Sequence, residues 1–206
     1  MQDNSTKHRS GKGHPNLASV CNSFRAIGVE GKLVRTPADL TGITHLVLPG
    51  VGAFGDCAVA LRKQNLANSI CEWISQDKPF LGICIGYQIL FDSSEETPGA
   101  QGLGIFKGHV RRFADKGQKI PHMGWNAVTP LHADTPIWAG MGESPYFYYV
   151  HSYYPEPQDK TLVAATSSYG DTFAAAIVKG RVIATQFHPE KSQIQGLRLL
   201  KNFLTL

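Results

Sequence analysis

The sequence predicts an open α/β fold, with a mostly parallel sheet, helices on both faces and a smaller antiparallel part. In the first half, short apolar stretches alternate with helical stretches, as parallel βαβ units require. Residues 80–83 are apolar except for one glycine and read as a strand buried on both faces. The second half has several strand-like stretches in succession, which indicates antiparallel pairing. These stretches are residues 105–113, 127–130, 146–154, 161–166 and 173–178.

The elements of the first half follow from apolar spacing. Residues 16–27 carry apolar side chains three and four apart and predict a helix, as do most of residues 56–77. Short strands are expected at 32–35 and 43–48. These elements supply the alternation on which the fold prediction depends.

The two ends of the chain differ in character. Residues 1–15 are polar, and we expect them to be disordered. Near the other end, Ser192 with Gln195 three residues later has the pattern of a capping box, which predicts the start of a last helix.

The composition is that of a single-domain globular protein. The chain has 206 residues, 42% of them hydrophobic, which is enough for one sizeable core. It has no apolar run of membrane-spanning length and no secretion signal, so we expect a cytoplasmic protein without a membrane partner. The net charge of +4 forms no basic stripe, so nucleic acid is not an expected partner. The four cysteines include no C-x-x-C pair, so neither disulfides nor a metal site are expected.

The residues around Cys84 predict a reactive thiol. Cys84 lies between the apolar residues 80–83 and residues 85–91, which read as the start of a helix. Gly82 and Gly86 allow a sharp turn and close packing, so the stretch has the pattern of a nucleophile elbow with Cys in place of Ser. A helix N-terminus also favours a thiolate. A small buried cysteine in a tight turn explains this stretch equally well.

A distant histidine favours the reactive thiol. A strand-like stretch leads directly into His188, and Glu190 follows two residues later. On an extended backbone these two side chains point to the same side, so the carboxylate can reach the imidazole. Cys84, His188 and Glu190 then act as nucleophile, general base and orienting group. Cys57 and Cys71 lack flanking glycines and read as packed or bystander thiols rather than catalytic ones.

Gly50, Val51 and Gly52 follow the strand predicted at 43–48. An attack by Cys84 on a carbonyl requires donors for the oxyanion. Glycines allow backbone N–H groups to turn toward a substrate, so we assign this loop that role together with the N–H of Ile85. A plain strand-to-helix turn is the alternative explanation of the same glycines.

Five stretches, occurring in this order, resemble the class I (triad) glutamine amidotransferases, which have a flavodoxin-like fold. The resemblance covers residues 16–206, which we take as one amidotransferase domain. The stretches are Leu48-Pro-Gly-Val-Gly-Ala-Phe-Gly-Asp56, Gly82-Ile-Cys-Ile-Gly-Tyr-Gln88, Pro121-His-Met-Gly-Trp-Asn126, Tyr146-Phe-Tyr-Tyr-Val-His-Ser-Tyr-Tyr154 and Gln186-Phe-His-Pro-Glu-Lys-Ser192.

The resemblance implies a glutaminase that needs no cofactor. Within the family, the stretches are most similar to subunits of a histidine-biosynthesis enzyme. Such a subunit hydrolyses glutamine to glutamate and ammonia, and passes the ammonia to a cyclase subunit with a (β/α)₈ barrel. The cyclase then makes imidazole glycerol phosphate and an aminoimidazole carboxamide ribonucleotide. The resemblance thus implies a one-to-one heterodimer with a cyclase.

The resemblance also implies roles for further residues. Gln88 lies one helical turn beyond Cys84, and its amide is expected to hold glutamine. The backbone at Ser152 and Tyr153 is expected to bind the backbone groups of glutamine. Tyr148 is expected to face the cyclase, and Lys191 is our candidate for an ion pair across that interface.

Two alternatives remain open at this point. The chain could be the glutaminase of another synthase, although Pro121-His-Met-Gly-Trp-Asn126 argues against this. It could also be a catalytically impaired module, because its N-terminus departs from the family pattern.

The family opens with an apolar strand that leads into an Asp-Tyr-Gly-x-Gly-Asn-Leu turn. Here the corresponding stretch is Arg9-Ser-Gly-Lys-Gly-His-Pro-Asn-Leu17, with no apolar residue just before it. A strand inside a doubly wound sheet should be apolar, so we expect residues 1–15 not to form one. Either these residues are disordered and the strand at 32–35 lacks a neighbour, or the usual start has been replaced. In both cases we expect an unusually unstable fold.

Overall fold

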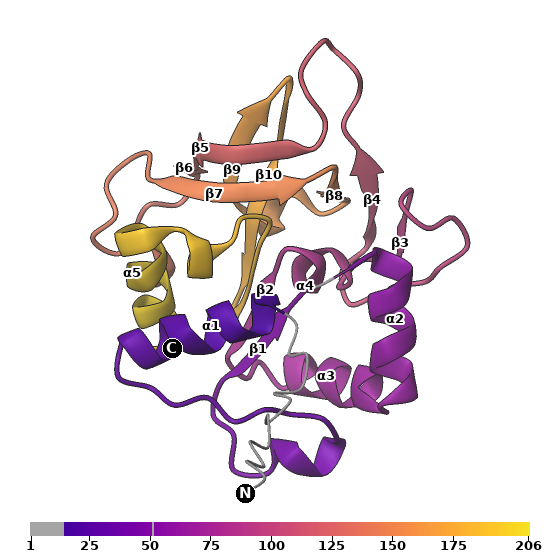
Figure 1. Ribbon diagram of the computed structural model, residues 1–206, viewed down its shortest axis with the longest axis vertical. Coiled ribbons are helices and arrows are strands. Elements are labelled where there is room, and N and C mark those ends of the chain that lie inside the picture. The colour runs from indigo at the N-terminus through magenta and orange to yellow at the C-terminus, as the bar shows by residue number, and fades with distance from the viewer. Residues whose placement is uncertain (1–14, 51) are drawn as a thin grey trace, which may run out of the picture.

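The structure is a computed structural model that describes residues 15–50 and 52–206. Its centre is a six-stranded open sheet with the order β1-β2-β11-β10-β9-β6 (Figure 1). The first three strands are parallel to one another, and each later neighbour is antiparallel. The bounds are Leu46–Pro49 for β1, Phe80–Ile83 for β2, Val182–Thr185 for β11, Asp171–Lys179 for β10, Val163–Tyr169 for β9 and Thr129–Pro130 for β6.

Helices cover both faces of this sheet (Figure 1). Val20, Phe24 and Phe203 from α1 (Pro15–Ala26) and α5 (Gln193–Phe203) form one core with the sheet. On the other face, α2 (Phe54–Lys63) and α3 (Leu66–Ser75) form a second core. The sheet is therefore buried between two helical layers.

The antiparallel part contains two smaller sheets. One has the order β3-β4-β8, and the other pairs β5 with β7. Figure 1 shows the β5–β7 pair lying across β9 and β10, above the carboxyl ends of β1 and β2. The bounds are Ser93–Ser94 for β3, Gly108–Arg112 for β4, Tyr153–Pro157 for β8, His122–Ala127 for β5 and Tyr146–His151 for β7.

Short turns complete the chain. A one-turn helix α4 spans Ile85–Gln88. Single 3₁₀ turns cover Pro37–Leu40, Pro136–Trp138, Lys160–Leu162 and Pro189–Lys191. No helix in the described part of the chain combines the length and apolar character that crossing a bilayer requires.

The predicted open α/β sheet with helices on both faces is confirmed, and so is the antiparallel part. The prediction of a strand at 32–35 is wrong, because these residues have no regular secondary structure. A strand needs a hydrogen-bonded neighbour, and among the described residues this segment has none. The prediction for residues 1–15 falls, except for Pro15 at the start of α1, outside the described residues.

Candidate active site

Cys84 occupies the predicted strand-to-helix turn between β2 and α4. Its backbone has φ 56° and ψ −107°, a conformation that non-glycine residues rarely adopt. Such strain typically persists where it serves function. A Cβ on Gly86 would lie 1.8 Å from the Leu48 carbonyl oxygen, and one on Gly82 would lie 2.6 Å from the Gly86 oxygen. The two glycines therefore permit the close approach of strand and helix that the sequence suggested.

The helix after Cys84 is shorter than expected. Residues 85–91 were expected to begin a helix, but α4 ends at Gln88. A macrodipole arises from aligned peptide units, so one turn contributes little to stabilising a thiolate.

His188 and Glu190 form a buried pair. The Nδ1 of His188 lies 2.7 Å from Oε1 of Glu190. Burial lowers the pKa of His188, but interactions with the Cys84 thiol and the Glu190 carboxylate outweigh it and raise the pKa to about 9. The backbone that joins the two residues forms the 3₁₀ turn Pro189–Lys191. The expectation of an extended backbone between them is therefore wrong. The Nε2 of His188 has no hydrogen-bond partner among the described residues and is left for proton transfer.

Ser192 holds the His188 backbone, a role that its position in the sequence did not suggest. Its hydroxyl donates to the His188 carbonyl oxygen at 2.6 Å and accepts from the Tyr148 N–H at 2.9 Å. The His188 N–H in turn donates to the Tyr148 carbonyl oxygen at 2.9 Å. The predicted capping box is therefore wrong, because the Ser192 side chain bonds to β7 and His188 and makes no cap hydrogen bond to α5.

Most of the predicted site residues line one cavity of about 500 Å³. Glu190 lies behind His188, Tyr148 lies outside the cavity lining, and Val51 lies outside the described residues. The predicted residues that line the cavity are Gly50, Gly52, Cys84, Ile85, Gln88, Ser152, Tyr153, His188 and Lys191.

Gln88 is fixed by hydrogen bonds at the cavity wall. Its Nε2 donates to the Tyr153 carbonyl oxygen at 2.9 Å and to Oε1 of Gln186 at 3.1 Å. Gln186 then donates to the Cys84 sulfur at 3.6 Å. Among the described residues the Oε1 of Gln88 has no partner, so it can accept a hydrogen bond from a substrate. Gln186 belongs to a stretch that resembles the family, but its position two residues before His188 predicted no contact with Cys84 or Gln88.

The glycine loop is only partly available for an oxyanion. The N–H of Gly50 donates to the Ile83 carbonyl oxygen at 3.0 Å, so it is not the donor that we expected. Gly50 instead allows close packing, since a Cβ there would lie 2.2 Å from the Cβ of Ile85. The N–H of Ile85 begins α4 and has no acceptor within that helix. Gly52 has φ 86°, which favours glycine.

Two buried histidines support the same wall. The Tyr153 carbonyl oxygen can only accept, so Nδ1 of His151 donates to it, at 2.8 Å. Nε2 of His151 then accepts from Nδ1 of His122 at 3.0 Å, and Nε2 of His122 accepts from the Asn126 amide at 3.3 Å. Burial lowers the pKa of His122 to about 4 and that of His151 to about 3, so both rings are neutral at pH 7.

The thiols of Cys57 and Cys71 are poorly suited to act as nucleophiles. Burial raises the pKa of Cys57 to about 11 and also raises that of Cys71. Neither residue lines the cavity that contains Cys84. Cys57 packs against both cores and fits a packed thiol, while the partly buried Cys71 fits a bystander thiol.

One face of the β5–β7 pair is rich in exposed aromatic side chains. Trp125 lies opposite Tyr148, with ring centroids 6.2 Å apart. Met123 is 62% exposed and Tyr146 is 57% exposed, which leaves this face open to solvent. The Lys191 ammonium lies 6.0 Å from the Tyr148 ring, so this face adjoins the active-site cavity.

Comparison with known proteins places the chain in a family. A family model described as "Glutamine amidotransferase class-I" matches residues 13–206. The chain belongs to the class I glutamine amidotransferases.

Curated relatives narrow the family further. The chain is 47% identical over 191 residues to "Imidazole glycerol phosphate synthase subunit HisH" of Synechococcus sp. (strain JA-3-3Ab), covering 92% of this chain and 88% of that protein. It is 43% identical to the protein of the same name from Dehalococcoides mccartyi (strain CBDB1), covering 94% of each chain. The chain therefore belongs to the HisH family of glutamine amidotransferases.

Solved structures with low sequence identity share the fold. "Structure of PurLQS from Thermotoga maritima" has a TM-score of 0.72 and 22% identity, covering 91% of each chain. A "Crystal structure of glutamine amidotransferase" has a TM-score of 0.70 and 21% identity, covering 91% of this chain and 92% of the other. At these identities the likeness concerns the fold alone.

Proposed function

We propose that this chain is the glutaminase subunit of an imidazole glycerol phosphate synthase of histidine biosynthesis. The observation that carries the proposal is the position of Cys84 in a strained turn, in one cavity with His188, whose imidazole bonds to Glu190. The HisH relatives support this synthase over others, and the complete triad argues against an impaired module.

The proposed reaction is an acyl transfer in two halves. The Cys84 thiolate attacks the carboxamide carbon of glutamine, and the Ile85 N–H stabilises the oxyanion. The protonated His188 gives its proton to the amide nitrogen, the C–N bond breaks, and ammonia leaves. His188 then takes one proton from a water molecule that attacks the thioester, the C–S bond breaks, and the product leaves as glutamate after losing the second proton. The Cys84 thiolate and the protonated His188 are thereby restored. Glu190 holds the imidazole and offsets its positive charge.

The proposed substrate contacts follow from the cavity lining. The side-chain Oε1 of Gln88 is buried without a partner among the described residues, and we propose that it accepts a hydrogen bond from glutamine. The backbone at Ser152 and Tyr153 borders the same cavity. Gly52 and Val51 complete the proposed loop, with Gly50 as a packing residue. We propose that docking aligns this loop, so the isolated chain should hydrolyse glutamine slowly.

The ammonia requires a second chain to use it. We propose that a cyclase subunit docks on the exposed face that carries Trp125 and Tyr148, with Lys191 at the edge of the contact. Aromatic residues are enriched at the centres of protein interfaces, and this face adjoins the cavity where ammonia would form.

All four cysteines are free thiols, which supports the expected cytoplasmic location.

The first prediction tests the nucleophile. Replacing Cys84 with Ala removes the attacking atom, so glutamate release should fall to background in the presence of the cyclase. The complex should still make product from added ammonium, because the cyclase is untouched. Cys71→Ala is the matched control and should retain near-wild-type glutamate release. Glutamine-dependent activity close to wild type in Cys84→Ala would refute the assignment.

A further inference from the structure

Gln186 places a fully buried amide beside the Cys84 sulfur. The Gln186 side chain has no exposed surface, and Cys84 is only 6% exposed. The Nε2 of Gln186 donates to the Cys84 sulfur at 3.6 Å. Gln186 therefore contacts the proposed nucleophile directly, and in the reaction proposed above this contact has no role.

The central sheet places these two residues side by side. β2 and β11 are parallel neighbours with Ile83 opposite Thr185, and Cys84 and Gln186 are the residues that directly follow the two strands. The Cys84 N–H donates to the Thr185 carbonyl oxygen at 2.8 Å. The Gln186 N–H donates to the Ala175 carbonyl oxygen on β10, also at 2.8 Å. The sheet thus holds both backbones, and with them the amide and the sulfur.

The hydrogen-bond partners fix which end of the Gln186 amide faces the sulfur. The Tyr153 carbonyl oxygen can only accept, so Gln88 presents its Nε2 to it, at 2.9 Å. The same Nε2 lies 3.1 Å from Gln186, so the Gln186 atom at that contact is the acceptor Oε1. The NH₂ end of the Gln186 amide then faces Cys84. A backbone carbonyl oxygen at the cavity wall thereby orients the donor that meets the thiol.

A buried amide donor favours the ionised form of a thiol. Burial disfavours a thiolate, because it removes water from the charge. A hydrogen bond to a charged acceptor is stronger than one to a neutral acceptor, so the amide stabilises a thiolate more than a thiol. The His188 imidazole loses its charge as pH rises through about 9, whereas an amide does not titrate. Gln186 can therefore support the thiolate at every pH.

Other titratable groups share the cavity with Cys84, and any of them can influence its ionisation. Those that line the cavity are Glu96, His151, Tyr153, His188 and Lys191. Glu190 lies behind His188 and bonds to it. Because a substitution at Gln186 leaves all of these groups in place, a difference in Cys84 ionisation between wild type and variant reports on the amide.

We infer that Gln186 supports the Cys84 thiolate with a hydrogen bond from its amide, in an orientation set by Gln88 and the Tyr153 carbonyl oxygen. This inference rests on the proposed function, because it assigns a role in the same reaction site. The bond to Gln186 also occupies Nε2 of Gln88, while the Oε1 of Gln88 has no partner among the described residues. The nucleophile and the amide proposed to hold glutamine then belong to one hydrogen-bonded chain.

The test is the rate at which iodoacetamide alkylates Cys84 in the full chain, measured against pH by mass spectrometry of the Cys84 peptide. Only the thiolate reacts, so the rate follows ionisation. Gln186→Met removes the donor but keeps an unbranched side chain. The midpoint of the pH profile should rise by about one unit, and alkylation on its acid side should slow about tenfold. The two rates should converge at high pH, where the thiol is ionised in both proteins.

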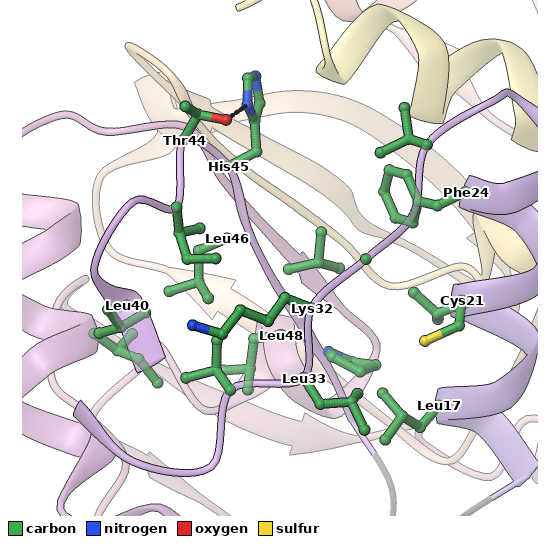
Figure 2. Close-up of a pocket in the computed structure, with 18 of the residues that line it drawn as sticks. Leu17, Cys21, Phe24, Lys32, Leu33, Leu40, Thr44, His45, Leu46 and Leu48 are labelled. Carbon is green, nitrogen blue, oxygen red and sulfur yellow. Dashed lines mark hydrogen bonds between the residues drawn. The ribbon is translucent and has the colours of Figure 1, made fainter. Parts of the chain in front are cut away.

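Cys21 provides an internal reference within the same samples. Figure 2 shows it on α1 at a separate cavity of about 410 Å³, which shares no lining residue with the cavity that contains Cys84. Gln186 lines neither cavity wall near Cys21, so Gln186→Met should leave the alkylation profile of Cys21 unchanged.

Thr185→Val is the matched control variant. Thr185 is also fully buried, and its hydroxyl donates to the Phe187 carbonyl oxygen at 3.1 Å. This substitution removes a buried hydrogen bond but takes no donor from the sulfur, so the Cys84 profile should match that of the wild type. Urea unfolding of both variants measures the loss of stability separately.

A measurement on the wild type does not depend on whether Gln186→Met folds. In heteronuclear NMR spectra, the side-chain NH₂ resonances of Gln186 should shift with pH along the alkylation profile of Cys84. This shift should be absent in Cys84→Ala, which retains His188 and the other titratable groups of the cavity.

Three results would overturn the inference. They are an unchanged midpoint in folded Gln186→Met, a rate lowered equally at all pH values, and Gln186 resonances that do not follow the Cys84 profile. The second is the effect expected of an amide that only stabilises the fold. Neither readout uses glutamine, so failure of the glutaminase proposal, seen as glutamate release by Cys84→Ala, is distinguishable from failure of this inference.

Discussion

The proton carried by His188 depends on two neighbours. Its pKa of about 9 lies above the ordinary value of 6.5, so the imidazole is charged across the neutral range. The Glu190 carboxylate accepts from Nδ1, which leaves Nε2 for the proposed proton transfer. Because the pKa is raised on folding, this pair contributes to stability as well as to chemistry.

The second prediction concerns Glu190→Gln and pH. A raised folded pKa stabilises the fold fully below about pH 6.5, and this contribution is lost as pH rises toward 9. The stability gap between wild type and Glu190→Gln should therefore be largest near pH 6 and shrink toward pH 9. Urea unfolding at each pH measures it, and exposed Glu143→Gln serves as the control. A gap that widens with pH would contradict the proposed proton position.

The third prediction concerns the buried histidines. His122→Phe keeps an aromatic ring beside Tyr149 and Tyr169 but leaves Nε2 of His151 without a donor. An unsatisfied buried group costs about 1–3 kcal/mol, so urea unfolding should show a loss of that size. His151 also bonds to Tyr153, so KM for glutamine should rise more than kcat falls. The exposed His132→Phe is the control. An unchanged KM in His122→Phe would show that His122 does not position the cavity wall that binds glutamine.

At the scale of single residues, local motifs were informative and long-range contacts were not. The tight turn at Cys84 and the contact between His188 and Glu190 were predictable because neighbours along the chain define them, while their catalytic roles stay predictions. The roles of Gln186 and Ser192 were not, because each depends on a partner distant in sequence. Gln88 and Gln186, for example, are 98 residues apart. The prediction of Gly50 as a donor failed because its N–H completes a bond to β2.

Between β2 and α4, close packing restricts which residues the turn can contain. The fourth prediction is that Gly86→Ala destabilises the fold by about 3 kcal/mol, the upper end of the usual cost of overpacking. The added Cβ would meet the Leu48 carbonyl oxygen, which is backbone and cannot rotate away. Gly31→Ala, where a Cβ would have open space, should stay within about 0.5 kcal/mol. Urea unfolding compares the two variants, and equal stability would show that the turn relaxes.

At the scale of elements, apolar spacing predicted helices well. The stripe of α3 is an example, since Leu66, Ile70, Trp73 and Ile74 are all buried. The strand expected at 32–35 failed because its local pattern resembles a strand while its hydrogen-bonding neighbour is missing from the described residues. Strand formation depends on a partner, so a single stretch of sequence determines it less than it determines a helix.

The whole molecule presents its proposed docking face next to its reaction site. The fifth prediction is that Lys191→Ala weakens cyclase binding several-fold, as expected for an exposed charge at the edge of an interface. Isothermal titration against the cyclase measures this, with exposed Lys63→Ala on α2 as the control. Unfolding of Lys191→Ala should match the wild type. Equal affinity of the two variants would place the interface elsewhere.

Tyr148 stands on that face, yet its two backbone groups bond to His188 and Ser192. One strand thus joins the surface where a protein would dock to the site where glutamine would bind. If docking shifts the strand, the two ligands are linked thermodynamically, and the effect must be reciprocal. Any factor by which the cyclase tightens glutamine binding is then the factor by which glutamine tightens cyclase binding. In Cys84→Ala no turnover consumes glutamine, so both factors can be measured at equilibrium. The two factors should be equal.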